Sequence, residues 1–311
     1  MSVVLVLAGL GLLALPGVAA PIARQLRPSE WRRLNRIAIG LGVVALQFGL
    51  VLAAVPTLLS AAGIESVAHA CHHLPGPVPP GGAVTGWASA TASLALFAVA
   101  LVVHRRSRRL QRAARIEEWL GEHRRMSGAR LVVLPTDAVV AYATPGSPPQ
   151  VVVSRGLVRA LEADELDAVV RHEMAHVRNR HHRDLALAAI VDATLGWIPG
   201  LRASTAALRL SIERAADEEA AERPGAREAI RGALLKTTET MLGPVPAFTA
   251  AFTFLARLDA LAMPPSDPSL RQRAAVFAPL AGLAAVAASG LVGWGAVSDH
   301  LILDLLGFCP F

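Results

Sequence analysis

The sequence predicts a mainly α-helical membrane protein in which four membrane-spanning helices carry one mixed α+β domain between the third helix and the fourth. The composition indicates this class, because 53% of the 311 residues are hydrophobic and the mean hydropathy is +0.46. Charged residues make up only 17% of the chain and cluster outside the longest apolar stretches. This profile is typical of several bilayer spans attached to a soluble segment.

Four stretches of the chain are free of charge and reach the roughly 20 apolar residues that a helix needs to cross a bilayer. They cover residues 3–23, 37–64, 83–103 and 274–297. Their Gly, Ala and Ser content suits close packing of helices in lipid. We therefore expect three transmembrane helices with their loops in residues 1–104, a soluble domain in residues 105–273, and a fourth transmembrane helix with a short tail in residues 274–311.

Arginine clusters flank these stretches at residues 24–36, 105–115 and 271–273. No basic residue precedes the first stretch, so a cleaved signal peptide is not expected. Positive residues stay in the cytoplasm, which places both termini outside the plasma membrane and the domain inside. The net charge of +6 comes from these flanks, not from a basic patch with interleaved aromatic residues, so we expect no direct binding of nucleic acid.

The domain between residues 105 and 273 has the pattern of a small sheet followed by helices. A basic amphipathic helix is expected over residues 105–123, and β-type runs follow at 130–134, 139–143 and 150–154. Acidic residues from Glu162 to Asp167 then mark the first turns of a helix that continues through the letters HEMAH.

The HEMAH segment, residues 172–176, indicates a metal and a reaction. On a helix, His172 and His176 share one face and can bind one Zn²⁺, while Glu173 lies beside it to transfer the proton of a water molecule. This arrangement is the apparatus for hydrolysing a peptide bond. The competing interpretation is a polar helix face with two unrelated histidines.

A third ligand has two candidates. Glu213 and Asp217 lie four residues apart on a later helix, so Glu213 could bind the zinc while Asp217 accepts a hydrogen bond from the distal nitrogen of His172. A solvated acidic helix is the alternative for this pair. His182 completes the HExxHxxGxxH spacing, although Asn179 stands where that motif has Gly, and a polar helix end at residues 180–183 is the favoured interpretation.

Taken together, these features resemble the BlaR/MecR-type membrane metallopeptidases. The resemblance rests on HEMAH, an apolar helix from Asp184, the break at residues 197–199 and the Glu213–Asp217 pair, all between the third and fourth spans. It implies a gluzincin with His172, His176 and Glu213 as zinc ligands, Glu173 as general base and Asp217 as the group that orients His172. It also implies a cytosolic winged-helix repressor as substrate. Only a short tail follows the fourth span in this sequence, so we expect no C-terminal penicillin-sensor domain like that of the family, and a β-lactam signal is not implied.

Two further interpretations remain open. A quality-control protease similar to the HtpX/CAAX-protease group also pairs HExxH with a downstream ExxxD at a cytoplasmic site. A non-catalytic membrane sensor could use zinc for structure alone, but such a site has no need of Glu173.

Cys71 and Cys309, the two cysteines of the chain, both fall outside the membrane in the expected topology. An oxidising compartment favours a disulfide between them. Free thiols, and a metal or redox site formed with neighbouring histidines, are the alternatives.

Overall fold

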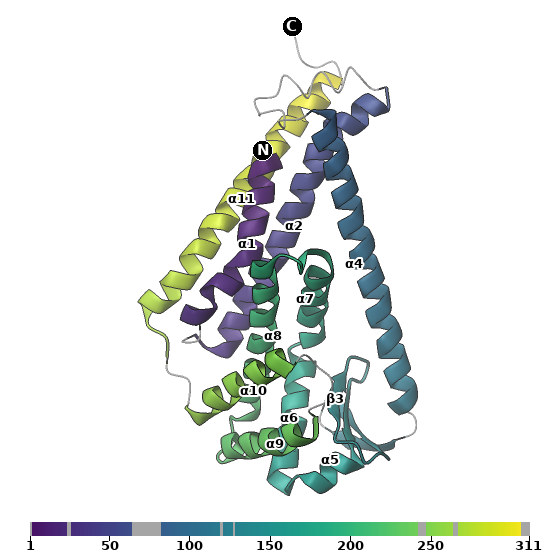
Figure 1. Cartoon of the computed structure of the whole chain (residues 1–311), viewed down its shortest axis with the longest axis vertical. Coiled ribbons are helices and arrows are strands. Elements are labelled where there is room, and N and C mark those ends of the chain that lie inside the picture. The colour runs from purple at the N-terminus through teal and green to yellow at the C-terminus, as the bar shows by residue number, and fades with distance from the viewer. Residues whose placement is uncertain are drawn as a thin grey trace.

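The computed structural model describes residues 2–23, 26–63, 82–118, 121–126, 128–241, 247–263 and 267–305. Over these residues the protein is mostly helical, with one small sheet. Long helices form one end of the molecule, and shorter helices and the sheet form the other (Figure 1). Cys71 and Cys309 lie outside the described residues, so their pairing stays a prediction.

Within the described residues, four helices are long and apolar enough to cross a membrane, which confirms the expected fold class. They are α1 (Ser2–Ala23), α2 (Pro28–Ala61), α4 (Ala83–Glu118) and α11 (Leu270–Leu305). The domain lies at the end of the bundle where α1 and α4 end and where α2 and α11 begin (Figure 1). All three arginine clusters therefore belong to the same end of the bundle.

Helices α1 and α2 pack closely because glycines line their contact. A methyl group added to Gly9 would lie 2.6 Å from the backbone nitrogen of Leu46, and one added to Gly42 would lie 2.9 Å from the carbonyl oxygen of Gly9. Without side chains at these positions the two backbones approach each other directly, as is common for helices in lipid.

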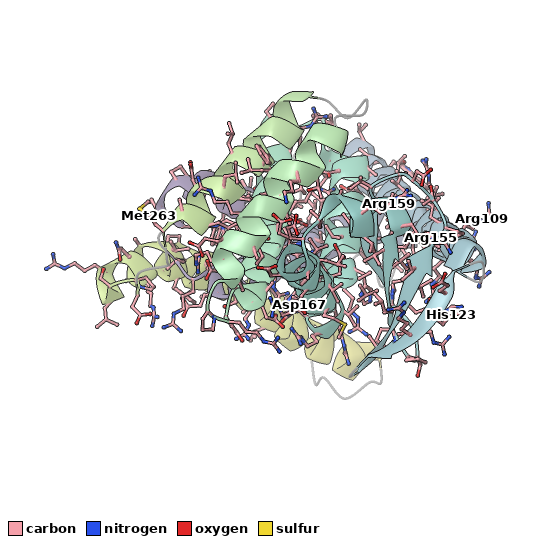
Figure 2. All side chains as sticks on the ribbon, turned by 90° about the horizontal axis from the view of Figure 1, so that it is seen from below. Arg109, His123, Arg155, Arg159, Asp167 and Met263 are labelled. Atoms are coloured by element: carbon pink, nitrogen blue, oxygen red, sulfur yellow. The ribbon has the colours of Figure 1, made fainter. Side chains whose placement is uncertain are left out.

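The sheet has four strands in the order β1-β2-β4-β3. These are β1 (Glu122–Met126), β2 (Ala129–Leu134), β3 (Ala141–Thr144) and β4 (Gln150–Ser154). β2 and β4 are parallel, and β1 and β3 pair antiparallel on either side of them. Figure 2 shows the sheet from the domain end, with His123 on its outer strand.

Strand β1 is a difference from the sequence prediction, which continues a helix to residue 123. In the structure this helix ends at Glu118, and β1 follows it. The segment EHRRM has neither the alternation nor the β-branched residues of a strand. Its partner decides its conformation: β1 pairs with β2 from Glu122 opposite Val133 to Met126 opposite Ala129. The other three strands match the expected runs to within one or two residues.

In the part of the chain that the structure describes, six helices follow the sheet and build the rest of the domain. They are α5 (Arg155–Ala160), α6 (Ala163–Arg178), α7 (His181–Leu195), α8 (Pro199–Ala220), α9 (Ala226–Met241) and α10 (Ala247–Ala262).

Helices α7 and α8 form a hairpin that packs into the bundle of long helices. Ser204 on α8 accepts a hydrogen bond from the backbone nitrogen of Gly17 (2.9 Å) and donates one to the carbonyl oxygen of Ala14 (3.1 Å). Leu13 of α1 and Leu208 of α8 belong to the same buried apolar cluster. The start of α8 therefore lies beside the half of α1 that is nearer the domain.

A buried ion pair fixes the start of this hairpin. Arg32 of α2 donates to Asp184 of α7 at 2.6 Å, and the side chains of these residues are only 5% and 1% exposed. Arg36 approaches the same carboxylate at 3.9 Å. This contact holds α7, and with it one wall of the site described below, to a membrane helix.

Candidate metal centre

Helix α6 carries the HEMAH segment, and its sequence explains where it begins. The side chain of Glu165 accepts a hydrogen bond from the backbone nitrogen of Glu162 (2.9 Å), which satisfies a group that the first turn of a helix leaves unpaired. Asp164 and Glu165 place negative charge at the positive end of the helix dipole. The helix then continues through His172 and His176, which lie on one face.

Helix α8 brings the carboxylates to that face. Ala168 of α6 and Ala216 and Ala220 of α8 are completely buried, so the two helices can pack closely. Glu213 and Asp217, one turn apart on α8, are thereby placed beside His172. The expected pairing of these two helices is present in the structure.

Three side chains converge with atom spacings that suit a tetrahedral metal ion. His172 Nε2 lies 3.1 Å from His176 Nε2 and 3.5 Å from Glu213 Oε2, and His176 Nε2 lies 3.8 Å from Glu213 Oε1. Ligands that bind zinc tetrahedrally at 2.0–2.1 Å lie about 3.3 Å from one another. The three residues therefore form a group that could hold a metal ion, and their nitrogen and oxygen donors suit zinc.

The outer nitrogens of both histidines each lie close to a polar atom of another helix. His172 Nδ1 lies 2.9 Å from Asp217 Oδ1, as expected from the sequence. His176 Nδ1 lies 2.9 Å from Nδ1 of His181, which is completely buried. The sequence interpretation of residues 180–183 as a polar helix end thus missed His181, because the turn between α6 and α7 decides which histidine points inward.

Arg257 is a second residue that sequence reasoning missed. It lies on α10 and donates to both oxygens of Asp217, at 2.8 and 2.7 Å, and its third nitrogen lies 3.2 Å from Glu213 Oε2. A single arginine within the apolar stretch of α10 was the only available signal. In the structure Arg257 thus contacts both Asp217 and Glu213.

His182, the other candidate for a third ligand, is not part of the converging group. It lies next to His181 on α7 and contributes to the wall of the cavity. The left-handed residue in the turn before it is Arg180 (φ 53°), whereas Asn179 has φ −86°. The side-chain nitrogen of Asn179 instead donates to the carbonyl oxygen of Ala175 and to Glu219.

The surroundings shift the pKa values of these groups in opposite directions. Burial and the neighbouring His172 lower the pKa of His176 to about 4, so this imidazole is neutral at pH 7. Burial also lowers the pKa of His172, but Asp217 and Glu213 outweigh this effect and raise it to about 10. Burial raises the pKa of Glu213, but His172 and Arg257 outweigh it and hold that pKa below its usual range. Metal binding would therefore release the proton that His172 holds.

Glu173 faces the cavity beside the converging group. Burial raises its pKa above the usual value for a glutamate, which brings it closer to the range in which a carboxylate accepts and returns a proton near neutral pH.

A cavity of about 1270 Å³ lies over the converging group. Strand β3 lines one side of it with Ala141, Tyr142 and Ala143. Apolar side chains from α9 and α10 line another part, namely Ile230, Ala233, Leu234 and Phe254. Basic side chains at the start of α7 line a third part, namely Arg180, His182 and Arg183. Such a volume is ample for several residues of a polypeptide.

Comparison with known proteins finds similarity in this part of the chain. Residues 104–215 match the family model described as Peptidase family M48. The chain is also similar to proteins named "Protease HtpX homolog": 37% identical over 71 residues to that of Acaryochloris marina, and 38% identical over 78 residues to that of Thermococcus sibiricus. Each match covers 22% of this chain, and 24% and 27% of those relatives.

The chain thus spans about a quarter of the length of the curated relatives that it matches. No solved structure matches it. The relatives favour the HtpX alternative over the BlaR/MecR resemblance, which they do not confirm. The matched segment contains HEMAH and Glu213, so the part of the chain that carries the converging group is similar in sequence to the peptidases of family M48.

Proposed function

We propose that this protein is an integral-membrane zinc endopeptidase that cleaves membrane or membrane-proximal proteins, as an HtpX-like quality-control protease. The observation that carries the proposal is the position of Glu173, beside three converging ligand atoms and facing a large cavity. A site that used zinc for structure alone would have neither the carboxylate nor the open space.

The roles of the residues follow from their positions. Zinc, when bound, would act as a Lewis acid that polarises the scissile carbonyl and lowers the pKa of water to about 7. His172, His176 and Glu213 would hold it. Glu173 would take the proton from the attacking water and pass it to the leaving amine, while Asp217 keeps the ring of His172 in place.

The shape of the cavity supports an extended polypeptide as substrate. β3 pairs with β4 along one side only, and its residues 141–143 line the cavity. An extended segment can add to such a strand through main-chain hydrogen bonds, which bind without regard to sequence. This mode suits a protease that removes many different damaged proteins.

The position of the cavity next to the membrane helices supports a substrate at the membrane surface. Arg183, at the wall of the cavity, directly precedes Asp184, which is paired with Arg32 of α2. Arginines at this level belong to the cluster that flanks the second span. We propose that the domain lies in the cytoplasm against the inner face of the plasma membrane.

Substrate capture distinguishes the proposed pathways. Glu173→Gln is expected to keep the zinc ligands and the cavity while stopping cleavage, so substrates stay bound. A tagged Glu173→Gln protein expressed in its own cells should retain unfolded membrane proteins, as identified by mass spectrometry, and the tagged wild type is the control. Retention of one winged-helix repressor would support a BlaR/MecR-like signalling pathway instead. Full activity of Glu173→Gln on a casein-like unfolded substrate would contradict the proposed peptidase.

The proposed topology predicts that Cys71 and Cys309 lie on the outer face. A membrane-impermeant thiol reagent applied to intact cells should label the protein only after reduction if the two cysteines form a disulfide, and before reduction if they are free. Labelling only after lysis would place both cysteines inside and would overturn the cytoplasmic position of the domain. A variant with both cysteines replaced by serine serves as the labelling control.

A further inference from the structure

His181 occupies a position beside His176 that matches the position of Asp217 beside His172. Each lies 2.9 Å from the Nδ1 atom of its histidine. The rings of His176 and His181 meet edge to face, with centroids 4.8 Å apart and an interplanar angle of 82°. The two proposed ligands on α6 are thus held by partners from two different helices, α7 and α8.

The ligand geometry decides which way the hydrogen bond runs. Nε2 of His176 faces His172 and Glu213, so Nε2 is the atom available to a metal. A neutral imidazole that binds through Nε2 carries its proton on Nδ1 and must donate it. Nδ1 of His181 is the atom in reach, so it accepts, and the proton of His181 resides on its own Nε2.

The cost of burying His181 argues against a role in packing alone. Its side chain is completely buried, and its Nε2 has no hydrogen-bond partner among the residues that the structure describes. A buried polar atom without a partner is destabilising, so an apolar side chain would fill this space at a lower cost. The histidine is explained by the bond that it makes to His176.

We propose that His181 is a positioning residue of the metal centre, which accepts the Nδ1 proton of His176 and so fixes the tautomer and the ring orientation of that ligand. The proposal rests on the proposed metal centre. Partners of this kind orient ligating histidines and raise their basicity. Because α7 is tied to α2 by the Arg32–Asp184 pair, the orientation of His176 also depends on a membrane helix.

Zinc affinity of the purified full-length protein tests this proposal. His181→Leu removes the acceptor and keeps the bulk, whereas His181→Asn offers an amide oxygen close to the position of the lost Nδ1. We expect His181→Leu to weaken zinc binding about 10–100-fold and to speed zinc release to a chelator. His181→Asn should stay close to the wild type. His123→Leu, the same change on the outer strand β1, is the matched control and should have no effect.

Thermal unfolding of the zinc-free protein separates positioning from packing. We expect His181→Leu to be about as stable as the wild type without zinc, because it removes the unpaired Nε2 of His181 but leaves Nδ1 of His176 without its acceptor. Equal zinc affinity in His181→Leu and the wild type, or equal losses in His181→Leu and His181→Asn, would overturn the proposal. If His181→Leu does not fold, His181→Ala takes its place in the comparison with His181→Asn. Failure of the wild type itself to bind zinc would refute the metal centre instead.

Discussion

Replacement of Glu173 by alanine is expected to abolish proteolysis while zinc stays bound. Glu173 lies next to the converging residues but does not belong to the group that could hold the metal. Its side chain faces the cavity. Proton transfer by a positioned carboxylate contributes about 10²–10⁴-fold to a rate, so turnover should fall by at least this order. Cleavage of an unfolded protein and the zinc content of the same preparation are the two measurements.

The matched controls for this prediction are the two histidines of the same helix. His172→Ala and His176→Ala should lose both zinc and activity, because each removes a ligand atom of the converging group. Restoring excess zinc should not rescue the Glu173→Ala protein. Loss of zinc from Glu173→Ala, measured by metal analysis, would contradict the assigned role in proton transfer.

The second large effect is expected at the carboxylates of α8. Glu213→Gln keeps the volume of the side chain but removes its charge, and it should bind zinc far more weakly than the wild type. Asp217→Ala should weaken zinc binding about 10–100-fold through His172. It should also destabilise the protein, because Arg257 would lose both of its hydrogen bonds to Asp217 while its charge stays buried. Removing one partner of a buried ion pair costs up to about 3–5 kcal/mol, and the contact that Arg257 keeps with Glu213 should reduce this cost.

Zinc titration and chemical denaturation of the purified wild type and of four variants measure these effects. His182→Ala is the control for zinc binding, because His182 lies outside the converging group, and its affinity should stay near that of the wild type. Asp217→Asn should recover part of the stability, since an amide oxygen can still accept from Arg257. If His182→Ala removes the metal and Glu213→Gln does not, Glu213 is not the third ligand.

The site residues that could be predicted from the sequence do not distinguish two families of membrane peptidase. HEMAH, the Glu213–Asp217 pair and four spans suit both the BlaR/MecR-type and the HtpX-type proteins. HEMAH and the Glu213–Asp217 pair predict how a metal would be bound. They do not predict which substrate is cleaved, so they do not distinguish the two families. The sequence favoured the BlaR/MecR-type proteins. The matches to HtpX proteases, which cover about a fifth of the chain, favour the HtpX-type proteins instead.

The sequence by itself determined the features whose pattern is local. A run of about 20 apolar residues can be accommodated only as a helix across the bilayer, so the four long helices could be predicted from composition and length. Ligands four residues apart share a helix face, which made His172 and His176 predictable as a pair. The spacing of Glu213 and Asp217 was visible for the same reason.

Only the tertiary structure decided which distant groups meet. Strand β1 forms because β2 offers it a main-chain partner, although its own residues indicate no strand. Arg257 reaches Asp217 from forty residues away because α10 packs on α8, and no periodicity links the two positions. His181, and not His182, meets His176 because the chain turns at Arg180 in a left-handed conformation. Contacts of this kind depend on how packed helices are rotated against one another, and a one-dimensional pattern does not contain that rotation.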